Sequence, residues 1–513
     1  MSSTIYSAAV WGLDAVPIEV EIDASPGLHM FCIVGLPDKA VEEAKERVGT
    51  ALRNSGFEPP HRQAHRVIVN LAPADFKKEG PAYDLPIAIG FLHATQQLPF
   101  DPLEKLFIGE LALDGAVRSV SGILPAVEMA VRKGSFEIFL PAANAPEARL
   151  VSEAIIYPVR TLAELVNHLK GAVLIEPYTS DEGRLSHSTH PNNNGIDFAF
   201  IQGQEHAKRA LEIAASGQHN VIFEGPPGSG KTLLAQAMLG IMPKMTDTEI
   251  REVTKIYSVA GLLSDRSAIM ASRPFRNPHH TASAISLTGG GTYPRPGEIT
   301  LAHRGVLFLD EFPEFARGAL ENLRQPLEEG HITVSRAQGA VRFPARFTLV
   351  AAMNPCPCGY ATDKEKDCTC PPAAIFKYQR KISGPLLDRI DLHVEVPRLG
   401  YDALASEKIA EESGTVRDRV EAARHMQQIR FDGTQTIANA EMGVREIKAF
   451  CKLDKQGESL LKDAVTRMKL SGRSYHHILK VARTIADLAA SSDIHAEHIA
   501  EAVQYRKREK SIG

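Results

Sequence analysis

The 513-residue chain lacks the features that mark membrane and secreted proteins. No apolar stretch is long enough to cross a bilayer, and no basic segment precedes an apolar one at the N-terminus, as in a secretory signal. Aromatic residues make up only 6% of the chain, with a single tryptophan. The 58 lysines and arginines are balanced by 62 acidic residues, so any contact with nucleic acid must come from a local basic patch. We therefore expect a cytoplasmic protein that makes no contact with membranes.

Cysteine is also scarce, since six residues in a chain of this length do not form a disulfide scaffold. Four of the six lie close together: Cys356, Cys358, Cys368 and Cys370. Four thiolates on two short turns fit tetrahedral zinc and leave no open position for catalysis. The Cys-x-Cys pairs are tighter than the usual ligand spacing, and the alternatives are reduced thiols in a surface loop or a redox pair. We predict a structural Zn²⁺ site.

The most specific pattern in the chain is a glycine-rich loop between an expected strand, 220–224, and an expected helix, 233–239. The loop consists of Gly225, Pro226, Pro227, Gly228, Ser229, Gly230, Lys231 and Thr232. Its glycines let the backbone wrap closely around a polyphosphate, whose oxygens face the loop N–H groups and the helix N-terminus. Lys231 would reach the β- and γ-phosphates, and Thr232 would ligate Mg²⁺. The pattern predicts that the chain binds a nucleoside triphosphate.

A second element supports hydrolysis as well as binding. Residues 305–311 form an apolar stretch that ends in two carboxylates, Asp310 and Glu311. Asp310 would hold Mg²⁺ directly or through water, and Glu311 would polarise the attacking water as a general base. The structural alternative is an acidic pair stabilised by a helix N-terminus. The phosphate loop upstream favours the catalytic interpretation.

The length of the chain predicts two to four domains, and the patterns along it suggest where they divide. Residues 1–175 alternate strand-like and helical patterns, and 176–195 are polar, as in a linker. Residues 196–397 contain the nucleotide motifs, and 398–513 show helical periodicity and charge. We predict an α/β fold with a helical lid, preceded by a separate α+β domain.

The order of the nucleotide motifs resembles that of AAA+ ATPases of the Mg-chelatase-like branch, which implies ATP and Mg²⁺ as cofactors. Residues 351–354 resemble the sensor-1 strand, in which Asn354 would help to orient the attacking water. Residues 386–391 resemble the segment that carries an arginine finger. Arg389 would then reach the γ-phosphate of the neighbouring subunit and offset the charge that develops there. The resemblance implies active sites that form between subunits, and therefore a ring.

Families of this type place a further arginine, sensor 2, at the start of a lid helix. Arg473 lies at such a position, and Arg483 follows nearly three helical turns later. We prefer Arg473, with Arg483 as the alternative or as a plain surface charge.

Two further segments resemble insertions of the same branch. The glycine-rich loop 288–297 resembles the helix-2 insert, and 330–346 has the pattern of two alternating strands around a polar turn. The second segment resembles the hairpin that points into the pore of the ring. Its arginines, Arg336, Arg342 and Arg346, would contact DNA phosphates there. The alternative is that they decorate a solvated hairpin.

The N-terminal segment resembles the protease domain of Lon-type proteases over residues 69–90 and 113–125. In such proteases these segments carry a nucleophilic serine and its lysine base. The matching positions here are Ala82 and Leu124, which can neither attack a carbonyl nor accept a proton. The resemblance implies the protease fold without peptide hydrolysis.

Taken together, these segments resemble the YifB/ComM family over nearly the whole chain. The resemblance implies a homo-hexameric ATPase that binds single- and double-stranded DNA, including branched DNA. It would drive branch migration when transforming DNA is integrated by homologous recombination, with recombination proteins as partners. The alternative is a Mg-chelatase-type ATPase that remodels a protein partner, and DNA-stimulated ATP hydrolysis would separate the two.

Overall fold

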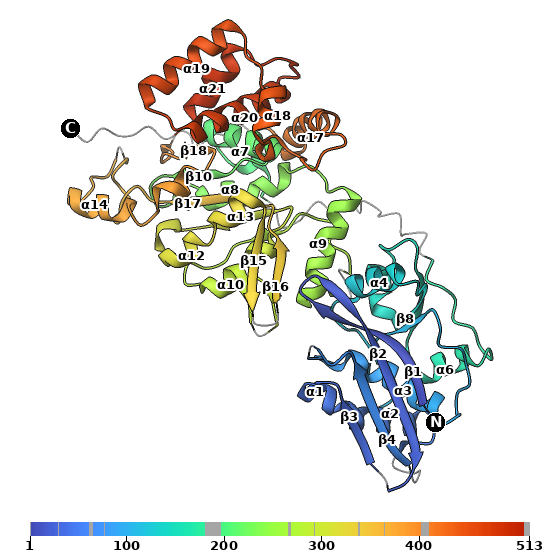
Figure 1. Cartoon of the computed structure of the whole chain (residues 1–513). Coiled ribbons are helices and arrows are strands. Elements are labelled where there is room, and N and C mark those ends of the chain that lie inside the picture. Colours follow the sequence, from blue (N-terminus) through green and yellow to red (C-terminus); the bar gives the residue numbers. More distant parts are fainter. Residues whose placement is uncertain are drawn as a thin grey trace.

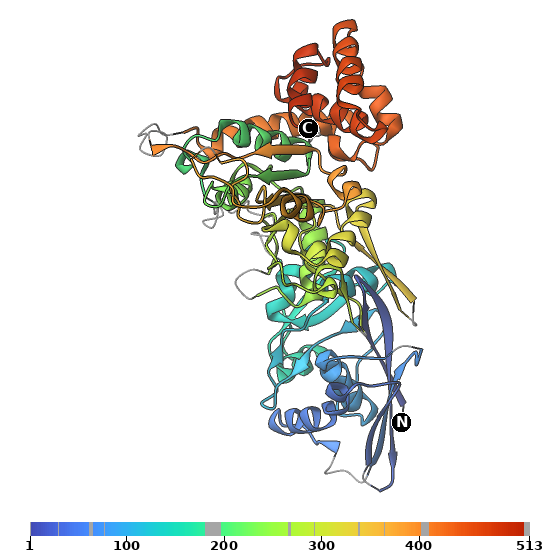
Figure 2. The same ribbon diagram turned by 90° about the vertical axis from the view of Figure 1, so that its left-hand side faces the viewer.

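A computed structural model describes residues 2–28, 30–60, 65–75, 77–179, 196–264, 268–291, 293–336, 339–363, 365–401 and 410–506. The described residues form an elongated molecule (Figures 1 and 2). An N-terminal unit lies at one end, a parallel-sheet core in the middle and a bundle of helices at the other end. Residues 180–195, most of the expected linker, lie outside the description. Within these ranges, no helix has both the length and the apolarity that a membrane span needs.

The N-terminal unit is built on a seven-stranded mixed sheet of order β3-β4-β2-β1-β5-β8-β9. Its strands are β1 Ser2–Trp11, β2 Asp14–Pro26, β3 Met30–Val34, β4 His65–Ala72, β5 Lys105–Phe107, β8 Glu137–Pro141 and β9 Ile155–Val159. Two-residue strands β6 Glu110–Leu111 and β7 Val117–Arg118 pair separately. In β2, apolar residues such as Val20 and Ile22 are buried while the acidic residues between them are exposed. This alternation of buried and exposed residues is typical of a sheet with one face exposed to solvent.

Helices cover the other face of this sheet and bury its apolar side chains. They are α1 Lys39–Glu42, α2 Ala44–Asn54, α3 Asp84–Ala94, α4 Ile123–Arg132, α5 Ala145–Ala148 and α6 Leu162–Leu169. Leu124, in α4, is fully buried in a hydrophobic cluster, and Ala82 packs against the same cluster. The fold therefore places these two inert side chains in one cluster, where the resemblance to Lon would require a serine and a lysine.

The central core is a five-stranded parallel sheet of order β11-β14-β17-β10-β18. Its strands are β10 Val221–Glu224, β11 Phe275–Arg276, β14 Val306–Leu309, β17 Thr348–Met353 and β18 Leu392–Glu395. Strands β14 and β17 are buried at every residue, which explains their continuous apolar sequence. Because β14, β17 and β10 are neighbours, their carboxyl ends meet at one edge of the sheet, where ligands of such folds bind.

Helices surround this sheet, and two small hairpins project from it. The helices are α7 Glu205–Gly217, α8 Lys231–Ile241, α9 Asp247–Ala260, α10 Ala284–Thr288, α11 Glu298–Leu301, α12 Arg317–Glu321, α13 Arg324–Glu329, α14 Pro372–Gln379 and α15 Gly384–Leu387. Helix α9 begins at a capping box formed by Thr246 and Glu249 and ends at Gly261 in the left-handed conformation. The hairpins are β12 Gly289–Gly290 with β13 Arg295–Pro296, and β15 His331–Arg336 with β16 Gly339–Pro344. Both lie in the segments where the sequence predicted insertions.

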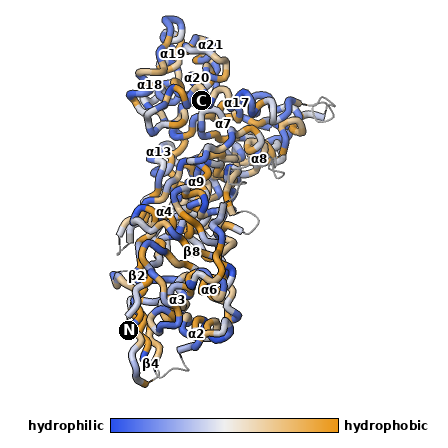
Figure 3. The backbone as a smooth tube through the Cα atoms, turned by 90° about the vertical axis from the view of Figure 1, so that its right-hand side faces the viewer, coloured by the Kyte–Doolittle hydropathy of each residue, from blue (hydrophilic) through white to orange (hydrophobic). Residues whose placement is uncertain are grey.

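The C-terminal unit is all-helical, with α17 Ser413–Arg430, α18 Val444–Phe450, α19 Lys455–Met468, α20 Gly472–Leu488 and α21 Ala496–Gln504. Hydrophobic and hydrophilic residues alternate along these helices (Figure 3). Their apolar sides belong to the same hydrophobic cluster as α7 and β10, so the lid and the sheet share one core. The predicted fold class, an α/β core with a helical lid behind a separate N-terminal domain, is confirmed.

Candidate functional site

The glycine-rich loop lies where the sequence predicted it, between β10 and α8. Gly228 and Gly230 have φ values of +75° and +91°, which favour glycine. A Cβ on Gly225 would lie 2.1 Å from the carbonyl oxygen of Val396, so only glycine fits there. The loop borders a cavity of about 390 Å³. The cavity is lined by Pro227, Gly228, Ser229, Gly230, Lys231, Thr232, Leu233, Asp310, Glu311, Met353 and Asn354.

Lys231 and Thr232 begin helix α8 at the floor of this cavity. The Lys231 ammonium donates to the carbonyl oxygens of Gly225 and Pro226, both at 2.8 Å, and to Asn354 Oδ1 at 3.3 Å. Burial lowers the pKa of Lys231 to about 8, although the charge of Asp310 opposes this shift. The Thr232 hydroxyl donates to Asp310 Oδ2 at 3.0 Å. A hydroxyl beside a carboxylate at the end of a phosphate loop is a donor set that suits Mg²⁺.

The two predicted acidic residues follow the buried strand β14 and differ in exposure. Glu311 has a φ of +50°, and its side chain is 55% exposed toward the cavity. Its backbone N–H donates to Asp310 Oδ1 at 2.9 Å. The backbone conformation at Glu311 points the two carboxylates in different directions. Asp310 faces Thr232, as a metal ligand would, while Glu311 reaches into the open part of the cavity, where a general base is needed.

The structure adds one residue that sequence reasoning missed, His280. Its Nδ1 lies 2.9 Å from Glu311 Oε2, so the imidazole holds the carboxylate proposed as the base. His280 lies on the segment between β11 and α10, and β11 pairs with β14 in the sheet. The neighbouring His279 bonds instead to the Thr281 hydroxyl at 2.8 Å. No motif in the sequence singles out His280, because its partner is brought to it only by the pairing of two strands.

Arg389 and Arg473 do not line the cavity but meet on another surface. Both guanidinium groups form ion pairs with Glu328 of α13. The Ser474 hydroxyl donates to Asp388 Oδ1 at 2.9 Å, which joins lid helix α20 to the segment that carries Arg389. The expected arginine finger and the expected sensor-2 residue therefore belong to one surface of the subunit.

Arg483, the alternative sensor-2 residue, lies in a different environment. Its side chain is 2% exposed, and it forms hydrogen bonds with Asp487 and with the carbonyl oxygens of Ser491 and Ser492. These contacts tie the end of α20 to the following turn. Arg483 thus stabilises the lid, and Arg473 remains the residue we propose for sensor 2.

The three arginines expected to contact DNA do not share one environment. Arg342 lies on the exposed face of β16, with Nη2 3.1 Å from the His331 ring. Arg346 follows β16 and forms an ion pair with Glu441 of the lid at 3.0 Å. Arg336 ends β15, and its side chain lies outside the described part. To meet a phosphate, Arg342 would have to leave only the His331 ring, whereas Arg346 would have to break an ion pair with Glu441.

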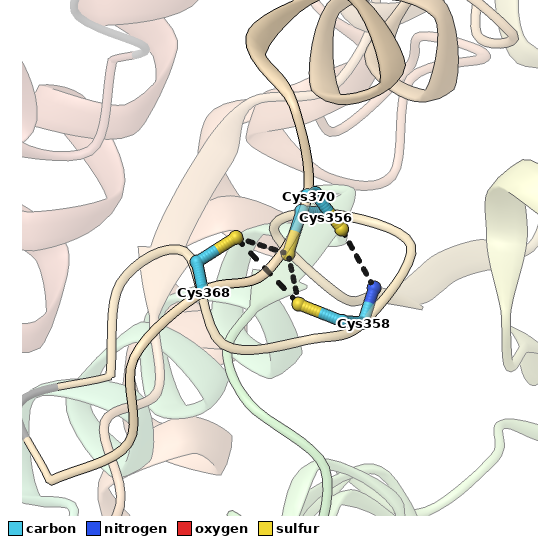
Figure 4. A group of neighbouring side chains, drawn as sticks. All are labelled: Cys356, Cys358, Cys368 and Cys370. Carbon is cyan, nitrogen blue, oxygen red and sulfur yellow. Dashed lines mark hydrogen bonds between the residues drawn. The ribbon is translucent and has the colours of Figure 1, made fainter.

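The four clustered cysteines converge on one point (Figure 4). All four sulfur atoms lie within 4.8 Å of one another, and Cys356 Sγ is 3.4 Å from Cys358 Sγ and 3.6 Å from Cys368 Sγ. Backbone N–H groups, above all that of Tyr360, lower the pKa of the Cys358 thiol, whereas burial and the neighbouring thiols raise the pKa of Cys368 and Cys370. The donor set therefore fits the predicted tetrahedral Zn²⁺.

The loop that carries the cysteine cluster packs beside the cavity. A Cβ on Gly359 would lie 2.5 Å from Cδ of Pro227, so the cysteine loop packs directly against the phosphate loop. Asn354, which bonds to Lys231, precedes the first cysteine by two residues. The cluster therefore supports the residues that face the nucleotide.

Comparison with known proteins gives matches along almost the whole chain. The family model of magnesium chelatase subunit ChlI matches residues 197–404, and the model of its C-terminal part matches 410–506. A further model, subunit ChlI of Mg-chelatase, matches residues 20–144. The chain thus resembles this subunit in three successive segments.

Several curated proteins are similar to this chain from end to end. The competence protein ComM of Haemophilus influenzae is 45% identical over 505 residues, which cover 98% of this chain and 97% of that protein. The uncharacterized protein YifB of Escherichia coli is 41% identical over 510 residues, with 98% and 97% covered. The magnesium-chelatase subunit ChlI of Guillardia theta is 29% identical over 181 residues, 31% of this chain and 51% of its own.

Proposed function

This chain belongs to the YifB/ComM family of Mg-chelatase-like AAA+ proteins, and on that premise we propose that it is an ATP-driven DNA motor. It works as a homo-hexamer in the cytoplasm, binds single- and double-stranded DNA, and promotes branch migration when transforming DNA recombines. The observation that carries the proposal is the cavity in which Lys231, Thr232, Asp310 and Glu311 converge. The name of the relative ComM supports the role in competence.

Hydrolysis follows from the positions of the chain's own groups. Thr232 and Asp310 would hold Mg²⁺, whose charge would offset that of the phosphates, and the Lys231 ammonium would turn from backbone carbonyls to phosphate oxygens. Glu311 accepts the proton of the attacking water, and Asn354 orients that water from the next strand. The phosphate loop Gly225–Thr232 supplies backbone N–H groups to the polyphosphate.

The arginine surface supports the ring. Arg389 and Arg473 both form ion pairs with Glu328, and neither lines the cavity of its own chain. In a head-to-tail ring this surface meets the cavity of the next subunit, so both arginines enter a neighbour's site. Each guanidinium then exchanges Glu328 for the charge on the transferring phosphoryl group.

The β15–β16 hairpin supplies the proposed contact with DNA. Its outer face carries Arg342 opposite Thr333, whereas its inner face is apolar. Contacts with the backbone phosphates, rather than with bases, suit a motor that must move along any sequence. The four cysteines would hold a structural Zn²⁺, and the loop that carries them would then keep the phosphate loop and Asn354 in place.

A second function, ATP-driven remodelling of a protein partner, is favoured by the match of residues 197–404 to the magnesium chelatase subunit. The experiment that separates the two is the ATPase rate with and without a synthetic forked DNA, with Glu311→Gln as the blank. We expect strong stimulation by DNA. A rate that does not respond to DNA would favour the remodelling function and remove the proposed role of Arg342.

A further inference from the structure

The N-terminal unit touches the proposed DNA hairpin through one tight turn. Strand β1 pairs along its full length with β2, with Trp11 opposite Asp14, so Gly12 and Leu13 form the turn between the two strands. In Figures 1 and 2 this end of the β1–β2 pair reaches the central core beside β16 and α9. We call residues Trp11–Asp14 the β1–β2 turn.

Contacts at the turn are close and specific. Gly12 is buried, has a φ of +65°, and faces β16 so closely that a Cβ would lie 2.3 Å from Val341 Cγ1. Trp11, the only tryptophan of the chain, and Leu13 pack against the hydrophobic cluster to which the inner face of the hairpin belongs. That inner face consists of Ile332, Val334, Val341 and Phe343.

The turn is held rigidly because the rest of its unit is anchored on α9. Glu128 of α4 forms ion pairs with Arg251 at 2.8 Å and with Lys255 at 2.9 Å. The Gly122 N–H donates to the carbonyl oxygen of Ser258 at 3.0 Å. Lys255 also lies 3.4 Å from Asp14 in the turn itself.

A two-stranded hairpin has little stability of its own, since each strand pairs with one neighbour only. The β15–β16 hairpin forms its own two-stranded sheet, apart from the five-stranded core. Its orientation therefore depends on what packs against its apolar face, and the β1–β2 turn is one of those contacts.

We propose that the β1–β2 turn is a brace that holds the β15–β16 hairpin in the position from which Arg342 meets DNA. The N-terminal domain, which has lost the residues for proteolysis, then acts in DNA binding through this contact. The inference rests on the proposed function, because it assumes that the hairpin contacts DNA. Trp11 and Gly12 are positioning residues and touch neither nucleotide nor DNA.

The test uses the full-length protein and two variants, Trp11→Ala and Gly12→Ala, with Leu28→Ala as the matched control. Leu28 is 93% exposed and follows the opposite end of β2. Affinity for a fluorescent forked DNA is measured by anisotropy, and ATP hydrolysis is measured without DNA. We expect both brace variants to bind DNA about tenfold more weakly than the wild type, a loss typical of residues that act on a binding site indirectly. Their rate of ATP hydrolysis without DNA should stay within about twofold of the wild-type rate. The control should bind DNA like the wild type.

A double variant tests the contact itself. Val341→Ala removes the methyl groups that a Cβ at Gly12 would meet, so Gly12→Ala with Val341→Ala should bind DNA more tightly than Gly12→Ala alone. Additive losses at the two positions, or brace variants that bind DNA like the wild type, would overturn the proposal.

Amide hydrogen exchange separates the brace from the proposed function. In Trp11→Ala, exchange in 331–336 and 339–344 should accelerate while the buried strand 348–353 stays protected. If the wild-type protein did not bind DNA, the proposed function would fall, and the exchange rates would still decide whether the turn holds the hairpin. Unchanged exchange in the hairpin would refute the brace.

Discussion

Lys231 lies in a cavity where a charge is costly until phosphate arrives. Burial lowers its pKa to about 8, and its ammonium is held by two backbone carbonyls and by Asn354. Across the cavity, Glu311 is held by His280 at 2.9 Å. The proposed base, Glu311, and the proposed phosphate-binding cation, Lys231, are thus both bonded to protein groups that water and nucleotide would have to replace.

The lowered pKa of Lys231 makes nucleotide binding pH-dependent. A lysine with a folded-state pKa of about 8 loses its proton as pH rises through that value. Above pH 8, the neutral Lys231 must therefore take up a proton before it can pair with phosphate, which weakens binding. In Glu311→Gln protein, the Kd for ATP should rise between about pH 8 and pH 9.5, by at most tenfold per pH unit. Calorimetry in buffers of different ionisation enthalpy should show proton uptake on binding. An affinity that is constant over this range would contradict the assignment.

The His280–Glu311 contact predicts a restrained base. Because the contact at 2.9 Å occupies a carboxylate oxygen that would otherwise be open to the attacking water, His280→Ala should raise ATP turnover without DNA, roughly tenfold, and leave the KM for ATP unchanged. His280→Asn keeps a donor at a similar position and should behave like the wild type. His279→Ala is the neighbouring control: the His279 ring lies against that of His280, but it bonds to Thr281 and not to Glu311. A fall in kcat for His280→Ala would mean that the histidine holds Glu311 in its productive position.

At the scale of elements, short segments acquire function through what packs against them. The cysteine loop lies against the phosphate loop through Gly359 and Pro227. The hairpin β15–β16 lies against the β1–β2 turn through Val341 and Gly12. Helix α20 joins Ser474 to Asp388, next to Arg389. In the first two cases, a segment without a large core of its own takes its position from a neighbouring element.

The packing of the cysteine loop predicts that metal supports nucleotide binding. The purified protein should contain about one zinc per chain by elemental analysis, since four thiolates fill one tetrahedral shell. Metal removal by a chelator, or Cys358→Ser, should weaken ATP binding about tenfold, because the loop supports Pro227 and Asn354. Cys32→Ser, in strand β3 of the other sheet, is the control. A metal-free protein with unchanged ATP affinity would refute this coupling.

The elements show which parts of the site a sequence can predict. The phosphate loop and the pair Asp310–Glu311 are each one continuous segment with a local pattern, so reading the chain was enough to predict both. The hairpin was predictable from its alternation, but the partner of Arg346 was not, because Glu441 comes from the lid. His280 and Gly12 were missed for the same reason, since their partners are set by strand pairing and domain packing.

At the scale of the whole molecule, the chain is an elongated unit with its functional surfaces in different places. The nucleotide cavity lies at the edge of the central sheet, and the arginine surface with Arg389 lies outside that cavity. The hairpin extends toward the N-terminal unit (Figure 2). In the ring that we propose, neighbouring subunits complete each ATP site, because Arg389 and Arg473 do not line the cavity of their own chain.

Shared sites predict recovery of activity in mixed rings. Arg389→Ala and Lys231→Ala should each lower ATP turnover by about 10³-fold alone, since the first removes the finger and the second the phosphate contact. In an equal random mixture, half of the chains keep Lys231 and half of their neighbours keep Arg389. About a quarter of the sites are then complete, so ATPase activity should return to about a quarter of the wild-type value. A mixture as inactive as its components would show that Arg389 acts within its own chain.

The measurement that tests the central claim most directly is branch migration on a labelled three-stranded junction, with ATP and with Glu311→Gln as the control. The account predicts that wild-type protein converts the junction to fully exchanged product only when ATP is hydrolysed, and that Glu311→Gln binds the junction without moving it. If the wild-type protein hydrolysed ATP in the presence of the junction but never moved it, the claim that this chain is a DNA motor would be contradicted.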